Sequence, residues 1–401
     1  MRRPAWRARA PRRGRHCHRV ISVCVLRGDA RQRKQMNTQV LSTRSGMPGA
    51  VVQRTRGVRP VSVVSGSPRC RAWHVLRAGL GSSSELASEP ETELDASGLK
   101  RLAWSRGGGR WWLWRGHPIH YTVSGADKPG TPFLLVHGFG ANSYHWRYNV
   151  PALADAGHPT YALCMLGYGK SAKPALEYTS ELWGALVADF LREVVGRPAL
   201  LAGNSIGAIA ALGAAYDAPE LTAGVALLNA AGRLDDLNSP AQSAPEAEDE
   251  DSAVMAALKA AFRRVVVSTI FLSTKFRIPQ ILSTVYVNKA RVDAQLVDSI
   301  YQPACDADAP EAFFHISNAG KRSKRSLTVL LTAAKERGVP MTLVWGNKDP
   351  WMPPTKAASI LAFYPAATFT GIDDAGHCPH DDSPVQANAA LLEWAASLAR
   401  V

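Results

Sequence analysis

The sequence predicts an α/β fold with a mostly parallel central sheet, helices on both faces of that sheet and a helical cap insertion. Short, continuous apolar runs alternate with segments whose apolar residues recur at helical spacing. Such alternation is typical of parallel strands joined by crossover helices. The alternation stops near residue 233 and resumes near residue 338, so the segment between these positions is expected to cover an active site.

The alternating elements begin at Trp111 and continue to the C-terminus. "WWLWRG" and "HPIHYTVSG" are expected to form two strands joined by a tight turn. The next run, "PFLLVHGFG", is apolar throughout and ends in glycine, which is typical of a buried parallel strand. Further strands are expected in "PTYALCMLGYG", "LLAGN", "TAGVALLNAAG", "PMTLVWGNKDPW" and "ATFTGIDDAGH". Helices are expected in "YHWRYNVPALADA", "SELWGALVADFLREVV", "TKAASILAFYP" and "PVQANAALLEWAASLA".

Composition divides the chain into five parts. They are a disordered transit peptide (1–78), a linker (79–109), the first part of the core (110–232), a cap (233–337) and the second part of the core (338–401). Within the cap, residues 235–251 are acidic and contain prolines, which predicts a flexible loop. "AVMAALKAAFRRVVVSTIFLSTKF" and "VDAQLVDSIYQP" are expected to be cap helices.

The formal net charge of +14 comes from the N-terminal segment. Residues 1–80 contain 19 lysines and arginines but one acidic residue, Asp29, whereas the remainder has 28 basic and 32 acidic residues. An Arg-rich, acid-poor head without an apolar core is typical of an organelle transit peptide. "VLRA" at 75–78 is the expected processing point, and Met36 is an alternative start. A disordered tail without a targeting role is the other interpretation.

The sequence gives no support for a nucleic-acid, metal or cofactor site. The basic charge lies in a segment without apolar periodicity rather than on a folded face. The six cysteines include no CxxC pair, and "HCH" at 16–18 is only a weak metal motif. "GGGR" at 107–110 precedes a strand, so it is expected to be a turn rather than a phosphate-binding loop. We therefore expect no nucleic acid, no metal and no cofactor, and a reducing compartment.

An Asn-Ser pair between two glycines interrupts the apolar stretch 200–215. "GNSIG" is a G-x-S-x-G sequence with a strand expected before it and a helix expected after it. In that context the serine occupies a sharp turn that exposes its hydroxyl group. Gly203 and Gly207 leave room for this turn to pack against its neighbours. Ser205 is therefore the predicted nucleophile.

A serine hydroxyl becomes an effective nucleophile only when a base accepts its proton. His377 follows an expected strand, precedes the last helix and comes third in the order Ser…Asp…His. It is the predicted base, and His380, three residues later, is the alternative.

The acid that orients the histidine is expected between the serine and the histidine, after a strand. Asp349 in "WGNKDPW" meets this requirement. Asp235 or Asp236, after "LLNAAG", is the alternative. Asp373 and Asp374 are expected to be turn residues.

Two backbone N–H groups are needed to stabilise the oxyanion of an acyl-transfer intermediate. One is expected from Ile206, the residue after the nucleophile, and the other from Phe139 in the loop after "VHGFG". His137 in the same loop is expected to have a packing role.

Five motifs together carry a resemblance to a known family. "HGFGANSYHWR", "LGYGKS", "GNSIGA", "WGNKDPW" and "DAGHCPHDD" resemble motifs of the α/β-hydrolase superfamily. They look closest to its chloroplast members in plants and green algae, the group that contains chlorophyll dephytylase. The resemblance covers Trp111 to about Leu398 without the acidic stretch. It implies an α/β-hydrolase fold and a chloroplast location, with the mitochondrion as the alternative.

The resemblance also implies roles for particular residues. Ser205, Asp349 and His377 become the catalytic triad, and Phe139 and Ile206 become the oxyanion donors.

The chain departs from the family pattern at two positions. Cys164 stands where such proteins usually carry Asp, and Ala208 stands where they usually carry Gly. The change at Cys164 is expected to alter a hydrogen bond near the site. Ser205 itself argues against the dehalogenases and epoxide hydrolases of the superfamily, which use a carboxylate nucleophile.

These observations predict a serine hydrolase that cleaves a carboxylic ester through an acyl-enzyme. The resemblance narrows the expected substrate to the phytyl ester of chlorophyll or a related pigment. A lipid or small-molecule esterase of the plastid is one alternative, and a non-catalytic ligand-binding protein of the same fold is another.

The apolar cap stretch "VVVSTIFLSTKF" adds an expectation about partners. Arg263, Arg264 and Lys275 flank or end this stretch. Apolar residues with basic flanks suit a long apolar substrate and contact with an anionic membrane surface. The alternative is a helix that buries its apolar face on the core.

Overall fold

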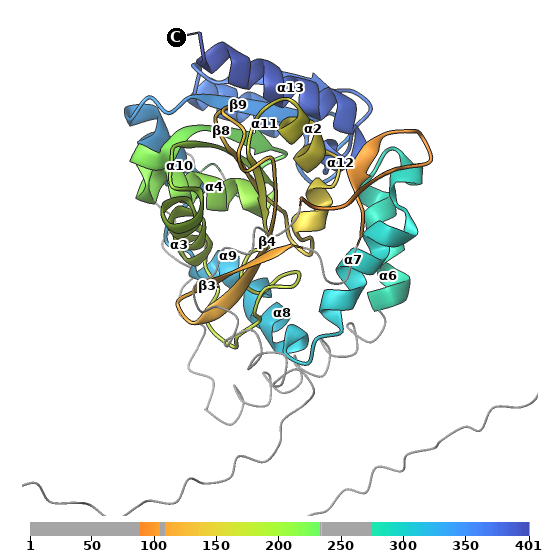
Figure 1. Ribbon diagram of the computed structural model, residues 1–401. Coiled ribbons are helices and arrows are strands. Elements are labelled where there is room, and N and C mark those ends of the chain that lie inside the picture. Colours follow the sequence, from red (N-terminus) through yellow and green to blue (C-terminus); the bar gives the residue numbers. More distant parts are fainter. Residues whose placement is uncertain (1–88, 105–108, 233, 235–273, 401) are drawn as a thin grey trace, which may run out of the picture. The chain divides into compact units, whose positions relative to one another are not determined.

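The computed structural model describes residues 89–104, 109–232, 234 and 274–400, which are coloured in Figure 1. All of them belong to one compact unit, Ser83–Val401. The expected transit peptide, the acidic loop 235–251 and the apolar cap stretch up to residue 273 lie outside the described residues. None of the described helices is long and apolar enough to cross a bilayer.

Eight strands of the described residues form the central sheet. They are β3 (Arg110–Trp114), β4 (His117–Ser124), β5 (Phe133–Val136), β6 (Thr160–Leu163), β7 (Ala199–Asn204), β8 (Thr222–Leu228), β9 (Met341–Gly346) and β10 (Thr368–Ile372). Their order across the sheet is β10-β9-β8-β7-β5-β6-β4-β3. Strands β5 to β10 pair in parallel, whereas β4 is antiparallel to both β3 and β6. The predicted α/β-hydrolase fold with a mostly parallel sheet is confirmed.

The first two strands of this sheet form the expected hairpin. Arg115 and Gly116 connect β3 to β4, and both have positive φ angles, of 48° and 80°. Two consecutive positive φ angles match the turn that suits the right-handed twist of paired strands.

Helices cover both faces of the sheet. The core helices are α2 (Asn149–Asp155), α3 (Ser180–Phe190), α4 (Ile206–Asp217), α10 (Leu327–Glu336), α11 (Pro354–Phe363), α12 (Pro379–Asp382) and α13 (Pro384–Leu398), with short turns η1 (Ser143–Trp146), η2 (Leu191–Val195) and η3 (Pro219–Leu221). The predicted helix 144–156 is thus divided into η1 and α2. Thr179 begins α3 as expected, because its hydroxyl oxygen accepts a hydrogen bond from the Leu182 N–H at 3.1 Å.

Successive residues of β5 point to opposite faces, and each face has its own core. Leu134 and Val136 belong to the cluster that contains α3, α4, α10 and α11, whereas Phe133 and Leu135 belong to the cluster with α2 and α13. All four side chains are fully buried. Burial of each contributes about 1.5–3 kcal/mol, so the continuous apolar run "FLLV" is what a strand buried on both faces requires.

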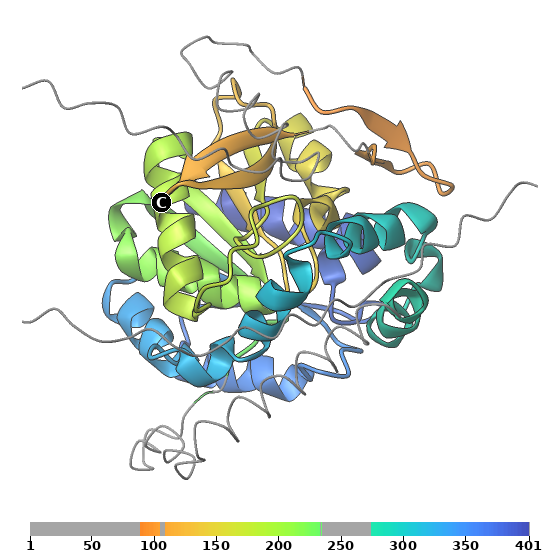
Figure 2. The same cartoon turned by 90° about the horizontal axis from the view of Figure 1, so that it is seen from below.

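The cap helices in the described residues lie to one side of the core. They are α6 (Thr274–Val285), α7 (Ala294–Ala304), α8 (Ala309–Ser317) and α9 (Ala319–Arg322), with the turn η4 (Lys289–Arg291). Figures 1 and 2 both place α6 beside α7. The two helices bury Ile278, Leu282 and Leu296 in a cluster of their own.

The cap is shorter than the sequence predicts. Residues 327–336 form α10, which was expected to lie in the cap. Leu327, Leu330 and Leu331 of this helix are instead buried in the core cluster with α4. A helix of this length has the same apolar periodicity in a cap or on a sheet, so periodicity does not locate the end of the cap.

The expected linker also differs from the structure, since part of it is folded. Strands β1 (Thr92–Leu94) and β2 (Lys100–Leu102) pair as an antiparallel hairpin. Arg101 is ion-paired with Glu93 and with Asp293 at the start of α7, and the Trp104 indole N–H donates to Asp298 of α7 at 2.8 Å. Both views place this hairpin beside α7. Asp95 of the hairpin is ion-paired with Arg291, and Glu93 accepts a hydrogen bond from Gln295 of α7. Acidic residues of the expected linker therefore have partners in the cap.

Candidate active site

Ser205 lies on a strained turn between β7 and α4. Its φ of 55° and ψ of −119° are unusual for a residue with a Cβ atom. The Ser205 N–H donates to the Leu228 carbonyl at 3.0 Å, and the Ser205 carbonyl accepts from the Ala231 N–H at 3.1 Å. Two backbone hydrogen bonds, one to the end of β8 and one to the segment that follows it, thus hold the strained conformation.

The glycines on either side of Ser205 are required by close backbone contacts. A Cβ atom on Gly203 would lie 2.3 Å from the Gly207 carbonyl oxygen. A Cβ atom on Gly207 would lie 2.3 Å from the Val136 carbonyl oxygen. The predicted steric reason for both glycines is confirmed.

His377 is hydrogen-bonded to Asp349, and both residues are buried. His377 Nδ1 lies 2.7 Å from Asp349 Oδ2. The same oxygen accepts from Asn229 Nδ2 at 2.7 Å, and Asp349 Oδ1 accepts from the Trp351 N–H at 2.7 Å. Both Asp349 oxygens therefore have fixed donors, which sets the direction in which the carboxylate faces His377.

These contacts keep Asp349 ionised. Burial alone would raise the pKa of its carboxyl group, but the hydrogen bond and charge of His377, together with backbone N–H donors, hold the pKa below its ordinary value. A carboxylate is an acceptor only, so His377 Nδ1 carries a proton, and in the neutral ring Nε2 then keeps the lone pair. That is the tautomer in which a histidine acts as a base.

The backbone of His377 is fixed from two sides. Its carbonyl oxygen accepts from Asn204 Nδ2 at 2.9 Å, and its N–H donates to the Val285 carbonyl at the end of α6 at 2.9 Å. The edge of the Trp351 ring lies against the imidazole, with ring centroids 5.0 Å apart. Asn204 is the residue before Ser205, so one side chain links the serine turn to the histidine loop.

The loop after β5 passes over Ser205. A Cβ atom on Gly138 would lie 3.2 Å from the Ser205 Cβ atom, so the loop approaches the serine closely. Phe139 is the next residue in this loop. Ile206 is the first residue of α4, and its N–H has no carbonyl partner within the helix. Phe139 is thus adjacent in the chain to the residue that approaches Ser205, and Ile206 is adjacent to Ser205 itself, while their role as oxyanion donors stays a prediction.

His137 has the packing role that the sequence predicts. Met165 N–H donates to His137 Nε2 at 3.0 Å, so the ring proton is on Nδ1, which lies 2.8 Å from the Gly138 carbonyl. Burial lowers the pKa of His137 to about 3, which keeps the ring neutral. This neutral ring fixes the loop that crosses Ser205.

The alternative site residues lie elsewhere or outside the described chain. His380 is fully buried and packs against the Trp146 ring, with centroids 4.1 Å apart. Asp373 and Asp374 are exposed turn residues that interact with Asn347 and Lys348. Asp235 and Asp236 lie outside the described residues.

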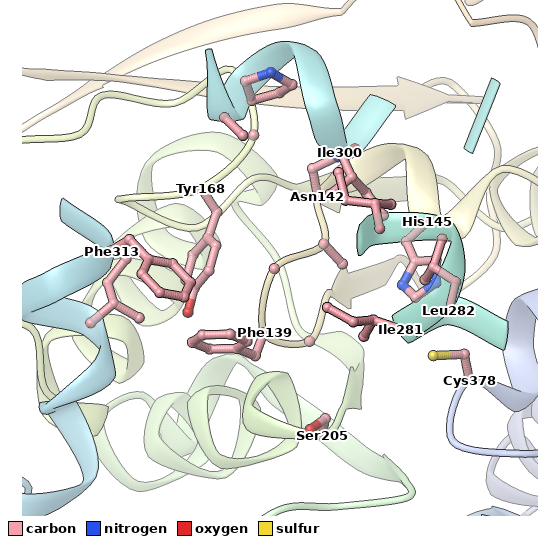
Figure 3. A pocket seen from close by; sticks show the side chains of 18 of the residues that line it. Phe139, Asn142, His145, Tyr168, Ser205, Ile281, Leu282, Ile300, Phe313 and Cys378 are labelled. Atoms are coloured by element: carbon pink, nitrogen blue, oxygen red, sulfur yellow. The ribbon is translucent and has the colours of Figure 1, made fainter. Parts of the chain in front are cut away.

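A mostly apolar pocket of about 520 Å³ opens at Ser205 and His377. In Figure 3, aromatic rings of Phe139, Tyr168 and Phe313 lie on one side of Ser205. Ile281 and Leu282 of α6, together with His145 and Cys378, lie on the other side. Core and cap therefore both line the pocket, which extends in two directions from the serine.

Cys164, the departure from the family pattern, lies behind the pocket wall. Its sulfur is 3.3 Å from the Ser143 nitrogen, 3.2 Å from the Ser143 hydroxyl oxygen and 3.5 Å from His120 Nδ1. Burial raises the pKa of the thiol, but the hydrogen bonds with His120 and Ser143 outweigh it and lower the pKa to about 7. Ala208, the other departure, is fully buried in α4.

Asn204 and Asn229 also belong to this site, although no motif predicts them. Asn229 follows β8 with a positive φ of 42°, donates to Asp349 and accepts from the Gly346 N–H at 2.8 Å. Both asparagines are polar residues at the carboxyl ends of buried parallel strands, where ligands of such sheets bind. Their place at these strand ends is the sequence feature that could have identified them as site residues.

Comparisons with known proteins agree with this fold. A family model described as alpha/beta hydrolase family matches residues 133–391. Chloroplastic pheophytinase of Arabidopsis thaliana is 28% identical over 313 residues, which cover 69% of this chain and 63% of that protein. The match thus spans less than two thirds of the relative.

Two solved structures have the same fold. A thermophilic esterase from Thermogutta terrifontis aligns with a TM-score of 0.55 and 19% identity over 73% of this chain and 99% of its own. A membrane phospholipase A described as a bacterial virulence factor aligns with a TM-score of 0.56 and 22% identity over 73% of this chain and 87% of its own. At these identities the likeness supports the fold alone.

Proposed function

Because the chain belongs to the α/β hydrolase family, we propose that it is a serine esterase that cleaves a carboxylic ester through an acyl-enzyme. The observation that carries this proposal is the His377–Asp349 hydrogen bond in a pocket that also contains the strained Ser205. A nucleophile, a base of fixed tautomer and an orienting carboxylate are the groups that acyl transfer needs.

The proposed reaction proceeds in two balanced steps. Ser205 Oγ attacks the ester carbonyl while His377 Nε2 accepts the hydroxyl proton. The N–H groups of Phe139 and Ile206 stabilise the resulting oxyanion. The intermediate collapses, and the leaving alcohol takes the proton from His377. Water then attacks the acyl-Ser205 ester by the same route, which releases the acid and restores the serine.

The substrate proposed first is the phytyl ester of a chlorophyll-type pigment, in a plastid. Two observations support this choice: the apolar lining of a pocket of about 520 Å³, and the similarity to a chloroplastic pheophytinase. A long isoprenoid alcohol needs an apolar channel, and the two-sided pocket suits an ester that enters with a chain on each side of its carbonyl.

The test compares the full chain with a Ser205→Ala variant. Both are incubated with pheophytin a and with chlorophyll a, and phytol release is followed by chromatography. Release by the wild type alone supports both the serine mechanism and the pigment ester. If neither pigment reacts, labelling of Ser205 by a fluorophosphonate separates the outcomes. A labelled enzyme acts on another ester, whereas an unlabelled, folded protein contradicts the esterase proposal.

The expected membrane contact rests on a stretch whose residues up to 273 lie outside the described structure. We propose that the pocket mouth contacts a lipid surface, because Phe139, Ile281 and Trp351 line the pocket and are about half exposed. Sedimentation with anionic lipid vesicles tests this contact. Ile281→Asp is expected to weaken it, and equal binding by both proteins contradicts it.

A further inference from the structure

The motif "DAGHCPHDD" contains a buried carboxyl group that the proposed reaction does not use. Asp382, the last residue of α12, is 2% exposed. Its neighbour Asp381 is ion-paired with Arg147, whereas Asp382 accepts hydrogen bonds from backbone N–H groups and has no cationic partner among the described residues. A buried carboxyl group without a cation is costly unless hydrogen bonds replace its water, so the donors around Asp382 have to stay in place.

The three donors to Asp382 come from two separate parts of the chain. Its Oδ2 atom accepts from the Gly376 N–H and from the Val287 N–H, each at 2.8 Å. Its Oδ1 atom accepts from the Asn288 N–H at 2.8 Å. Gly376 directly precedes His377, whereas the other two donors follow α6 in the cap. One side chain thus joins the loop that carries His377 to the backbone of the cap.

The same two parts of the chain are also in direct contact. The His377 N–H donates to the carbonyl oxygen of Val285, the last residue of α6, at 2.9 Å. A Cβ atom on Gly376 would lie 2.0 Å from that oxygen, so only a glycine allows the two backbones to come this close. The hydrogen bonds of Asp382 therefore lie immediately beside the contact that holds the backbone of His377.

Helix α6 has a second role, because it lines the pocket with Ile281, Leu282 and Val285. Figure 3 shows the first two of these side chains on the opposite side of Ser205 from Phe313. The helix that would contact the substrate is therefore also the helix that holds the backbone of the histidine.

His377 is thus fixed from two directions. Asp349 holds its ring from the core, and the end of α6 holds its backbone from the cap. Proton transfer needs both constraints, because a displacement of about 1 Å from the reactive geometry can cost about 10²-fold in rate.

We propose that Asp382 is a positioning residue, which ties the loop that carries His377 to the cap so that the histidine reaches Ser205 only when the end of α6 is in place. The proposal rests on the proposed esterase function, in which His377 is the base. It makes the cap part of the catalytic geometry rather than only a cover for the pocket. Asp382 acts through His377 and does not contact the reacting atoms.

The first test is Asp382→Asn. An amide group has one oxygen and two N–H donors, so at least one of the three backbone N–H groups would face another donor. We expect kcat for the best ester substrate to fall about 10²-fold. Asp306→Asn is the control, because it breaks an ion pair between the cap and Lys173 of the core, 2.9 Å long, that does not involve the histidine. It should keep kcat near the wild-type value. An equal fall in both variants, or an unchanged kcat in folded Asp382→Asn, contradicts the proposal.

A second pair of variants acts from the cap side, at the exposed Asn288. Asn288→Pro removes the N–H that donates to Asp382, and the φ of −81° at this position is close to that of proline. Asn288→Ala keeps the N–H, although both variants lose the side chain that accepts from the Ala290 N–H. We expect kcat to fall about fivefold in the proline variant and to be unchanged in the alanine variant. Equal kcat values overturn the proposal, and this pair decides the question if Asp382→Asn does not fold.

Hydrogen exchange gives a measurement that needs no turnover. The amides of Gly376, Val287 and Asn288 are expected to exchange slowly in the wild type and to exchange faster together in Asp382→Asn, while the amides of β5 and β7 keep their rates. Faster exchange throughout the protein would assign the effect to general stability and contradicts the proposal. If no ester is cleaved and Ser205 is not labelled by a fluorophosphonate, the esterase proposal fails, and exchange still decides whether Asp382 holds the loop. If an ester is cleaved but these amides exchange equally in both proteins, the positioning proposal alone fails.

Discussion

Two buried carboxylates, Asp349 and Asp381, show how the same group acquires different uses. Asp349 is hydrogen-bonded to Nδ1 of His377, a residue that lines the pocket. Asp381 accepts from Arg147 and Tyr286 and is fully enclosed between core and cap. The first carboxylate contacts an imidazole in the pocket wall, and the second joins two parts of the fold. The difference follows from the partner of each carboxylate. Asp349 faces an imidazole, a group that can exchange protons, whereas Asp381 faces a guanidinium, which stays charged.

Asp349→Asn is expected to have the largest effect on activity. The amide cannot hold the Nδ1–H tautomer of His377, so kcat is expected to fall about 10⁴-fold while the melting temperature changes little. Turnover of the best ester substrate and a thermal melt are the measurements. Asp374→Asn, in an exposed turn of the same strand-end region, is the control and should retain activity. A loss below about tenfold in Asp349→Asn would falsify the orienting role.

Arg147→Met is expected to have the largest effect on stability. It leaves Asp381 buried without its cation, and loss of one partner from a buried ion pair costs about 3–5 kcal/mol. Arg192→Met is the matched control. The ion pair of Arg192 with Asp189 lies at the surface, where such pairs contribute about 1 kcal/mol or less. Urea unfolding of both variants gives the comparison. Equal losses would mean that the Arg147 network does not hold the cap.

The sequence predicted one of these two networks much better than the other. Ser205, Asp349 and His377 each follow a strand of a parallel sheet, and the carboxyl ends of such strands meet at one edge. Motif order and strand position were therefore enough to bring them together. Their catalytic roles remain proposals.

The Arg147–Asp381 pair had no such signal, because the two residues are 234 positions apart on elements whose packing depends on the whole fold. For the same reason the hairpin 92–102 was expected to be a linker, since its charged residues Arg101 and Asp95 find their partners in the cap, at Asp293 and Arg291. Local periodicity determines elements, whereas the partner of a charged side chain depends on tertiary packing.

Cys164 is a third buried group whose charge depends on its partners. Its thiol changes between the neutral and the charged form near physiological pH. Its pKa is lowered to about 7 from an ordinary 9.0, so the folded state favours the thiolate. This stabilisation is complete above pH 9 and is lost as the pH falls through 7. The unfolding free energy is expected to rise by about 2 kcal/mol from pH 7 to pH 9. Cys164→Ser should remove this rise, and a rise that persists in the variant would assign it to another group.

Tyr168 and Tyr178 offer the smallest and cleanest test of whether the partner sets the contribution of a buried polar group. Tyr178 donates its hydroxyl hydrogen to the Pro174 carbonyl at 2.9 Å, whereas the Tyr168 hydroxyl has no partner among the described residues. Tyr178→Phe is expected to lower the unfolding free energy by about 1 kcal/mol. Tyr168→Phe is expected to leave the unfolding free energy unchanged or to raise it by up to about 1 kcal/mol, because it removes a buried hydroxyl group that has no hydrogen bond to compensate for its loss of water.

Both rings pack against Trp183, so the apolar contacts of the two tyrosines are matched. Equal losses in the two variants would show that the Tyr168 hydroxyl has a partner in solution and would place it with the paired groups.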